Sequence, residues 1–130
     1  MSRPVEIQDL GINPVKLSVV RWGMRDVVMG SSGTARNTGR VPGLTYAAKT
    51  GTANLQTAGL YHAWYCGFAP FKSPKIAFAA VIGRTHESGG QAAAPLIRNV
   101  FISMQADPEL RKYLLEDESA PEDMVIGVQP

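Results

Sequence analysis

The sequence predicts an α+β fold in which an antiparallel sheet is flanked by helices. Residues 61–69 alternate between two faces in the manner of a strand. Residues 75–82 form a nearly continuous apolar run that fits a strand covered on both faces. The link between these two segments is so short that they should pair antiparallel. Apolar residues within 93–104 recur at helical spacing and predict a long helix.

Composition limits the class of protein. The 130 residues suffice for one modest domain, and 45% hydrophobic with 18% charged residues is typical of a globular chain. The net charge of +2 comes without any run of Lys or Arg, so nucleic acid is not an expected partner. Cys66 is the single cysteine and cannot form an internal disulfide. Residues 1–6 carry an acid and no apolar block, unlike a signal peptide, and no apolar run is long enough to span a membrane.

Before the first strand, the sequence predicts one helix between two irregular segments. Residues 1–12 lack a sustained period, and Asn13 followed by Pro14 is a favourable helix start. The helix should run over residues 14–29 as scaffold, and residues 30–43 are expected to form a loop. The expected apolar stripe of this helix comprises Leu17, Val20, Met24, Val27 and Val28.

The remaining elements follow from the same patterns. The first strand is expected over residues 44–54, ahead of the two strands described above. Asp107 should cap a short second helix that ends near Leu115. Residues 1–115 would then form the domain, and residues 116–130 an acidic flexible tail. The long helix is expected to bury Ala93, Leu96, Ile97, Val100, Phe101 and Met104.

The edges of the predicted sheet need partners. An antiparallel sheet of only three strands exposes two edges. The run 76–82 is too apolar to lie at an exposed edge without inviting aggregation. We therefore expect that the chain either belongs to a larger sheet or pairs with another chain.

The stretch around Lys49 is the candidate functional element. One lysine stands among small residues, and Thr50 and Thr52 follow it. Small residues allow a second backbone to lie close to a strand, the lysine supplies a point charge, and the hydroxyls can bind an anion. These properties predict a strand that holds an extended peptide bearing a carboxylate. The alternative is an edge strand whose exposed lysine discourages further pairing.

Other chemical interpretations have less support. Residues 43–50 nearly fit a phosphate-binding loop, but a loop precedes them and no helix follows, which is the wrong context. Cys66 and His62 are four residues apart on one strand, about 13 Å along it, so a buried cysteine beside Trp64 and Phe68 is the better expectation. His86 lies in a polar loop, and the two histidines are too distant in sequence to indicate a metal site.

Lys49-Thr50-Gly51 acquires meaning from the segments around it. Together they closely resemble the C-terminal part of the transpeptidase domain of class B penicillin-binding proteins, with the penicillin-binding protein 2 group nearest. The resemblance extends over about residues 10–105. It implies a partial penicillin-binding or serine β-lactamase-like transpeptidase fold. The matching segments are 23–28, 33–35, 49–53, 62–70, 74–77 and 88–95.

The resemblance implies a D,D-transpeptidase that cross-links peptidoglycan stem peptides ending in D-Ala-D-Ala and that is trapped by β-lactams. Lys49 would raise the positive potential near the nucleophile and assist proton movement. Thr50, Gly51 and Thr52 would bind the substrate, with both hydroxyls on its carboxylate and the Thr52 backbone N–H in the oxyanion hole. No cofactor or metal is implied. Such a protein would be anchored in the bacterial cytoplasmic membrane with its catalytic domain on the outer, periplasmic side.

The nucleophile of that family is absent from this sequence. None of the eight serines has a lysine three residues later, so no Ser-x-x-Lys motif exists, and Ser-x-Asn is missing as well. We therefore expect the chain alone to be inactive and the N-terminal part of the transpeptidase to be its companion. Two alternatives remain open: an inactive fragment that serves as a structural or interaction module, and a fragment of a β-lactamase or D,D-carboxypeptidase.

Overall fold

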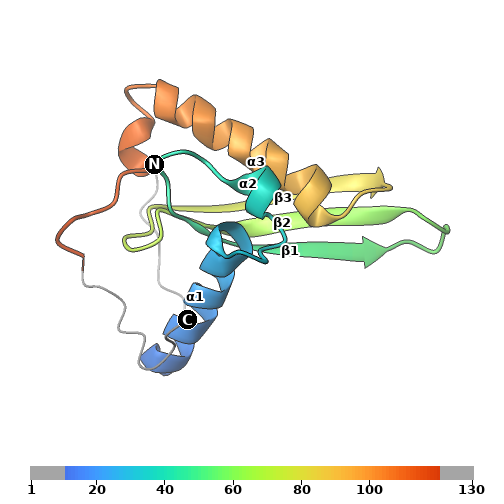
Figure 1. The fold of residues 1–130 in the computed structure, drawn as a ribbon, viewed down its shortest axis with the longest axis horizontal. Coiled ribbons are helices and arrows are strands. Elements are labelled where there is room, and N and C mark those ends of the chain that lie inside the picture. Colours follow the sequence, from blue (N-terminus) through green and yellow to red (C-terminus); the bar gives the residue numbers. More distant parts are fainter. Residues whose placement is uncertain (1–10, 121–130) are drawn as a thin grey trace.

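The α+β prediction is confirmed by the computed structural model, which describes residues 11–120 (Figure 1). The expected lead-in up to residue 10 and the expected tail from residue 121 lie outside the described residues. In Figure 1 the helices α1 and α3 diverge from each other, with the strands between them. The elements are α1 (Pro14–Met29), α2 (Arg36–Gly39), β1 (Ala47–Asn54), β2 (Tyr61–Ala69), β3 (Ile76–Thr85), α3 (Gly89–Ala106) and the 3-10 helix η1 (Arg111–Tyr113).

The three strands form one antiparallel sheet in the order β1-β2-β3, as the short connections predict. Tyr65 pairs with Thr50 on one side and Ala80 on the other, and these residues belong to what we call the helix face, because α3 packs on it. Their neighbours Lys49, Cys66 and Ala79 pair in the same way and belong to the opposite surface, the open face. Since side chains alternate along a strand, this register assigns the residues of the sheet to one of the two faces, up to the irregularity where Tyr61 pairs with Thr85.

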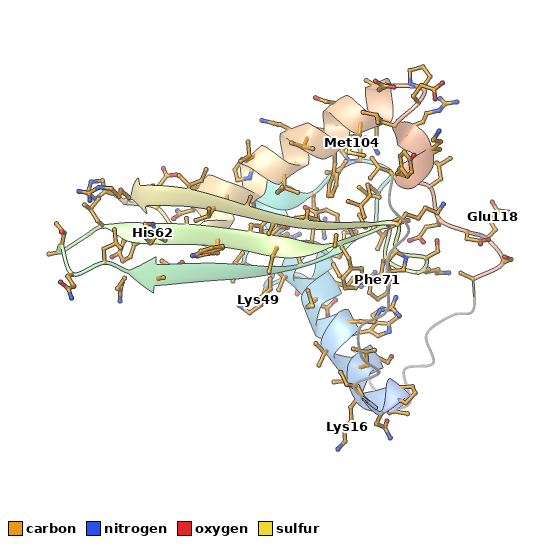
Figure 2. All side chains as sticks on the ribbon, turned by 180° about the vertical axis from the view of Figure 1, so that it is seen from behind. Lys16, Lys49, His62, Phe71, Met104 and Glu118 are labelled. Carbon is orange, nitrogen blue, oxygen red and sulfur yellow. The ribbon has the colours of Figure 1, made fainter. Side chains whose placement is uncertain are left out.

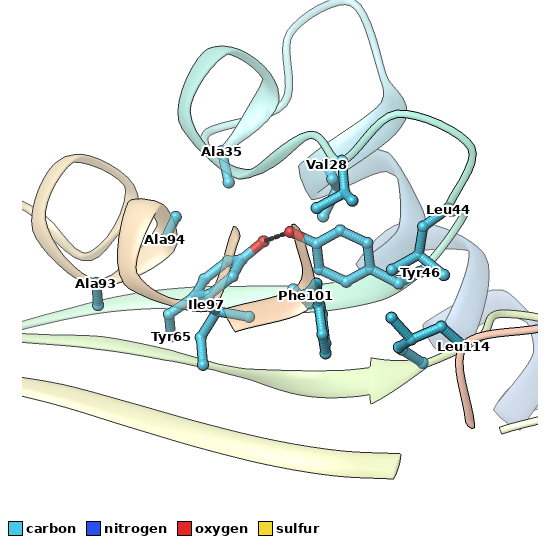
Figure 3. Packing of buried hydrophobic residues seen from close by; sticks show 13 residues of the cluster. Val28, Ala35, Leu44, Tyr46, Tyr65, Ala93, Ala94, Ile97, Phe101 and Leu114 are labelled. Atoms are coloured by element: carbon cyan, nitrogen blue, oxygen red, sulfur yellow. Dashed lines mark hydrogen bonds between the residues drawn. The ribbon is translucent and has the colours of Figure 1, made fainter. Parts of the chain in front are cut away.

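The core lies between the helix face and α3 (Figure 3). Phe101 of α3 is almost fully buried and meets the ring of Tyr46 edge-on, with centroids 5.2 Å apart. The ring of Phe78 approaches Phe101 in the same edge-on manner at 5.4 Å. Edge-to-face aromatic pairs of this kind add about 0.5–1.5 kcal/mol beyond the area they bury. This aromatic cluster fixes how α3 lies across the sheet.

The buried side of α3 differs from the expected stripe. Ala93, Ile97 and Phe101 are buried as predicted, whereas Leu96 and Val100 are 46% and 45% exposed. Gly89, Gly90, Ala93 and Ala94 in the first two turns are also buried, so the helix approaches the sheet with its smallest residues. The expectation for Leu96 and Val100 was wrong because a 3.6-residue period does not fix which edge of the apolar stripe faces the sheet.

The expectation that β3 is covered on both faces was also wrong. Its burial alternates along the strand, with Phe78 half-buried on the helix face and Val81 48% exposed on the open face. Cys66 is exposed rather than buried, and its neighbour Trp64 is 45% exposed. Within residues 11–120, nothing covers this part of the open face. The sheet is therefore one-sided over much of its length.

Helix α1 begins as the sequence predicts. The Asn13 side chain accepts hydrogen bonds from the backbone N–H groups of Val15 and Lys16, and Pro14 occupies the first turn. Val28 is fully buried, but Leu17 is 43% exposed, so only the C-terminal end of the apolar stripe reaches the core. The remainder of the helix extends away from the sheet toward Lys16 (Figure 2).

Two short segments differ from their predicted form. The expected loop 30–43 contains the single turn α2, and the expected helix after Asp107 is only a capped turn followed by η1. Glu116 does not begin a free tail, because its carboxylate accepts hydrogen bonds from the backbone N–H groups of Lys72 and Ser73, each at 3.1 Å. The chain after α3 is thus tied to the turn between β2 and β3.

A buried pair of phenols links α2 to the sheet. The Tyr46 hydroxyl donates to the carbonyl of Gly39 at 2.6 Å and lies 3.0 Å from the Tyr65 hydroxyl. Burial raises the pKa of both tyrosines above the ordinary value, and for Tyr65 the neighbouring Tyr46 hydroxyl raises it further. A Cβ at Gly39 would lie about 3 Å from both hydroxyls, so only glycine fits beside the pair.

None of the helices described between residues 11 and 120 combines the length and the hydropathy that a membrane span requires.

The two faces of α3 can be compared by one pair of substitutions. Ile97→Ala should lower the free energy of unfolding by about 2–5 kcal/mol because Ile97 is 93% buried and its removal leaves a cavity. Leu96→Ala should cost about 1 kcal/mol or less, since half of this side chain already contacts solvent. Urea unfolding measures both, and equal losses would contradict the assignment of the buried face.

The tyrosine pair predicts a loss of stability in alkali. Since the pKa of each phenol is raised in the folded state, its contribution is complete below the unfolded value near 10. Above about pH 10 the unfolded chain releases protons that the folded chain retains, so stability falls. Tyr65→Phe should weaken this dependence, measured as the difference in urea midpoint between pH 8 and pH 11. An unchanged pH dependence in the variant would refute the assignment.

Candidate functional site

Lys49 lies near the middle of β1, which is an edge strand of the sheet within residues 11–120. Its side chain belongs to the open face, where Cys66 is its partner on β2, and it is exposed. The ammonium group donates a hydrogen bond to the carbonyl of Thr50 at 2.5 Å. Figure 2 shows Lys49 on the side of β1 from which α1 projects. The charge is thus held at the sheet edge rather than free in a loop.

Thr50 and Thr52 belong to the opposite surface, the helix face, because strand side chains alternate. The Thr50 hydroxyl lies 2.8 Å from the hydroxyl of Thr34, a residue between α1 and α2. The Thr52 hydroxyl accepts a hydrogen bond from the backbone N–H of Gly89 at 3.3 Å. The structure therefore places both threonine side chains on the helix face of β1 and the lysine side chain on its open face.

The first turn of α3 crosses directly over these threonines. A Cβ at Gly89 would lie 2.2 Å from the Trp64 carbonyl oxygen and 2.5 Å from that of Gly51, and one at Gly90 would lie 2.3 Å from the Thr34 carbonyl oxygen. Any side chain at these positions would overlap with the backbone beneath it. Two consecutive glycines thus allow the helix N-terminus to touch the strand.

Ser88 and Gln91 join at the N-terminal end of α3 in the manner of a capping box. The Gln91 side-chain oxygen accepts from the Ser88 backbone N–H at 3.4 Å and from the Ser88 hydroxyl at 3.1 Å, while the Gln91 N–H donates to the Ser88 carbonyl. The N-terminus of an 18-residue helix carries a partial positive charge of roughly half an elementary unit. Together with Lys49, it makes both sides of β1 electropositive near Thr50.

The segment that carries Thr34 is held against the end of α1. The Ala35 backbone N–H donates to the carbonyl of Val27 at 3.0 Å, and the Ala35 side chain is fully buried. A Cβ at Gly33 would lie 2.4 Å from the carbonyl oxygens of Asp26 and Val27, so glycine is needed for this approach to the end of α1. A hollow of about 380 Å³ opens beside the segment, lined by residues 26–27 and 30–34.

The small residues of β1 have different reasons for their size. Ala47 and Ala48 are fully buried, and a Cβ at Gly67 on β2 would lie 2.1 Å from the Ala47 carbonyl oxygen. Their small size serves packing within the domain. Gly51 faces the side chain of Trp64, whose Cβ would lie 3.2 Å from a Cβ added there. The clearance expected for a bound peptide is therefore confined to the outer edge of β1.

The remaining sequence candidates do not form a second site. Cys66 and His62 both belong to the open face, but Trp64 lies between them on the strand, and Cys66 is exposed to solvent. His86 interacts through Nδ1 with the Gly59 carbonyl oxygen at 2.7 Å in the loop beyond β1. In the part of the chain that the structure describes, no three His, Cys, Asp or Glu side chains gather in a way that could hold a metal ion.

Sequence reasoning did not identify Thr34 or Gly89 as members of this site. The Ser88-Gly89-Gly90 signal was visible, since two glycines at a helix start indicate a close backbone approach. No local signal marked Thr34, because its contact with Thr50 spans 16 residues and depends on how the loop after α1 folds back. The roles of Lys49, Thr50, Gly51 and Thr52 in binding or catalysis remain predictions.

Comparison with known proteins gives consistent matches. The family model described as the penicillin binding protein transpeptidase domain matches residues 1–101. The chain is 36% identical over 93 residues to the peptidoglycan D,D-transpeptidase PbpA of Mycobacterium tuberculosis, which covers 65% of this chain and 19% of that protein. It is 32% identical over 107 residues to the peptidoglycan D,D-transpeptidase MrdA of Haemophilus influenzae, covering 70% and 16% respectively.

A solved structure agrees with these relatives. Pseudomonas aeruginosa PBP2, in complex with WCK 5153, superposes with a TM-score of 0.69 at 32% sequence identity. The superposition covers 91% of this chain and 26% of that one. The chain thus spans about a fifth of the length of the curated relatives and about a quarter of the solved one.

The contact between α3 and β1 can be tested with two glycine substitutions. Gly89→Ala should destabilise the domain by about 1–3 kcal/mol, because the new methyl group overlaps two carbonyl oxygens and forces the helix away. Gly23→Ala, inside α1 where a Cβ meets nothing within 4 Å, should be neutral or stabilising by about 0.5–1 kcal/mol. Thermal unfolding compares them, and equal midpoints for the two variants would exclude the close contact.

Proposed function

The chain belongs to the penicillin-binding protein transpeptidase family, and on that premise we propose that it is the substrate-binding C-terminal part of a peptidoglycan D,D-transpeptidase of the PBP2 type. The observation that carries the proposal is the position of Lys49-Thr50-Gly51 on an edge strand beneath a helix N-terminus. An edge strand can pair with an extended peptide, and the charges around it favour a carboxylate. The residues of this site are expected to act on one substrate from two sides.

The stem peptide would lie along the outer edge of β1 as an additional strand. Thr50 faces the helix face, so its hydroxyl would receive the terminal carboxylate of D-Ala-D-Ala there. Lys49 faces the open face, so its ammonium would raise the positive potential where the nucleophile approaches. Gly51 follows Thr50 and has no side chain, so the backbone beyond the two residues stays accessible at the edge.

The backbone N–H of Thr52 would be one of two donors to the oxygen of the attacked carbonyl. Negative charge develops on that oxygen in the transition state, and preorganised N–H donors stabilise it by several kcal/mol. The Thr52 side chain is already occupied by the Gly89 N–H, which holds this part of the strand in place. The hydroxyl would contribute to carboxylate binding with its remaining hydrogen-bonding capacity.

The reaction proceeds through an acyl-enzyme. A serine oxygen attacks the penultimate D-Ala carbonyl, the bond to the terminal D-Ala nitrogen breaks, and the serine proton passes to that leaving amine. The amine of an acceptor stem peptide then attacks the ester, and the serine oxygen recovers a proton as the cross-link forms. Lys49 assists these proton movements through its positive charge, and β-lactams trap the serine because they mimic the D-Ala-D-Ala end.

The serine itself must come from a companion segment, because no Ser-x-x-Lys occurs in this sequence. We propose that this companion is the N-terminal part of the same transpeptidase. It would cover the open face, where Trp64 and Val81 are about half exposed, and the projecting part of α1, where Val19 and Val20 are each 58% exposed. Apolar side chains grouped on a surface in this way indicate a contact with another segment. A companion segment that lies between the open face and α1 would bring its serine toward Lys49.

The proposal extends to domain organisation and location. Residues 1–115 would be the C-terminal portion of the transpeptidase domain, and residues 116–130 an acidic segment that follows it. The complete enzyme would be anchored in the bacterial cytoplasmic membrane and act on its outer, periplasmic side. It would require no metal or cofactor, since serine acyl transfer is supported by the lysine and backbone N–H groups alone.

Labelling with fluorescent penicillin tests the proposal directly. In the protein isolated with its companion, the label should appear on the companion and not on this 14.0 kDa chain, read on a denaturing gel with intact mass. Lys49→Ala should slow the labelling by about a hundredfold or more, as removal of a charge aimed at the reacting atoms does elsewhere. Lys112→Ala, on the distant η1, should leave the rate unchanged.

The other outcomes separate the alternatives. Absence of label in every sample would indicate an inactive fragment that serves as a structural or interaction module. A label that is rapidly hydrolysed rather than transferred to an amine acceptor would favour a fragment of a β-lactamase or D,D-carboxypeptidase. A label on this chain would contradict the missing nucleophile.

A further inference from the structure

We propose that Thr34 is a positioning residue that orients the Thr50 hydroxyl toward the carboxylate of the substrate or β-lactam. The inference rests on the proposed function and adds to it a residue outside the Lys49-Thr50-Gly51 segment. It is carried by the hydroxyl–hydroxyl distance of 2.8 Å between Thr34 and Thr50 and by the backbone contacts that hold both residues.

The position of Thr34 is set by three elements. Its neighbour Ala35 is anchored to the end of α1 by the backbone hydrogen bond to Val27, and Gly33 lies directly against that helix end. On its other side, a Cβ at Gly90 would lie 2.3 Å from the Thr34 carbonyl oxygen and 3.6 Å from the Thr50 methyl group. Thr34, Thr50 and the first turn of α3 therefore meet at one point.

The hydroxyl pair has a directional consequence. A threonine hydroxyl has one proton to donate and can accept two hydrogen bonds. If Thr50 donates its proton to a carboxylate, its oxygen is free to accept the proton of Thr34. The chain then runs from Thr34 to Thr50 to the anion, and each bond polarises the next. Without Thr34, the Thr50 hydroxyl can rotate among its staggered positions, and binding must restrict that rotation.

The hydroxyl pair lies where a ligand can reach it, since Thr50 is only partly buried and Thr34 is exposed. The nearby Thr38 is engaged differently, since its hydroxyl donates to the Gly90 carbonyl at 2.5 Å and is partly buried. Thr38 thus holds the turn of α3, whereas Thr34 holds the side chain that would meet the ligand. The two threonines of the same segment have separable tasks.

The test compares acylation rates in the assembled transpeptidase that contains this chain. Two probes are used: a penicillin with its free carboxylate and the same penicillin with that carboxylate esterified. Thr34→Val should slow acylation by the acid about three- to tenfold, the effect of one hydrogen bond, and should change the rate with the ester by less than about twofold. Thr34→Ser, which retains the hydroxyl, should restore most of the rate.

Two controls make the result specific. Thr57→Val, in the exposed loop between β1 and β2, should change neither rate. In a Thr50→Val background, Thr34→Val should cause no further loss with the acid, because residues that act through one another are not additive.

Equal slowing of the acid and the ester by Thr34→Val would overturn the inference and indicate a structural role only. An additional loss in the Thr50→Val background would also overturn it, since Thr34 would then act independently. Failure of the unsubstituted transpeptidase to react with either probe would instead refute the proposed function, which distinguishes the two failures.

Discussion

The structure depends on the direct contact between the first turn of α3 and strand β1. Gly89 and Gly90 carry no side chains, so the helix approaches the carbonyl oxygens of Gly51, Trp64 and Thr34 more closely than any other residue would allow. Glycine in a helix costs about 1 kcal/mol relative to alanine. The hydrogen bonds of the first turn offset part of that cost, since the Gly89 N–H donates to the Thr52 hydroxyl and the Ser88 N–H to the Gln91 side chain. As a result, the Thr34 loop, strand β1 and the first turn of α3 meet at one point, although they are distant in sequence.

The aromatic core holds the helix in this position from farther along α3. Phe101 packs edge-on against Tyr46 and Phe78, and the hydroxyl of Tyr46 reaches the Gly39 carbonyl at the end of α2. A rotation of α3 would disrupt these ring contacts as well as the contact of Gly89 with the strand. The Tyr65 hydroxyl completes the buried polar pair, so that no phenol in this core is left without a partner. Packing and site geometry are therefore coupled through one helix.

Two surfaces of the domain leave large apolar side chains exposed to solvent. Half-exposed Trp64 and Val81 on the open face, and the valines of α1 that project into solvent, are apolar groups that a complete globular domain normally covers. The relatives are much longer than this chain, which corresponds to about a quarter of the solved Pseudomonas aeruginosa structure. Their additional segments are candidates for covering these surfaces. The apolar run 76–82 predicts for the same physical reason that the sheet needs further partners. Apolar surface of this kind is stabilised only when another segment removes it from water.

The sequence by itself determined the order and type of the main elements. The Asn13 cap defined the start of α1, and the alternation of residues 61–69 identified β2 and assigned its faces, because these signals are local. It also identified the Lys49 segment through a resemblance to a known family. Only the tertiary structure decided which side of α3 is buried, that Cys66 is exposed, and that Thr34 meets Thr50. Each of these depends on contacts between residues far apart in the chain, which no local period or propensity encodes.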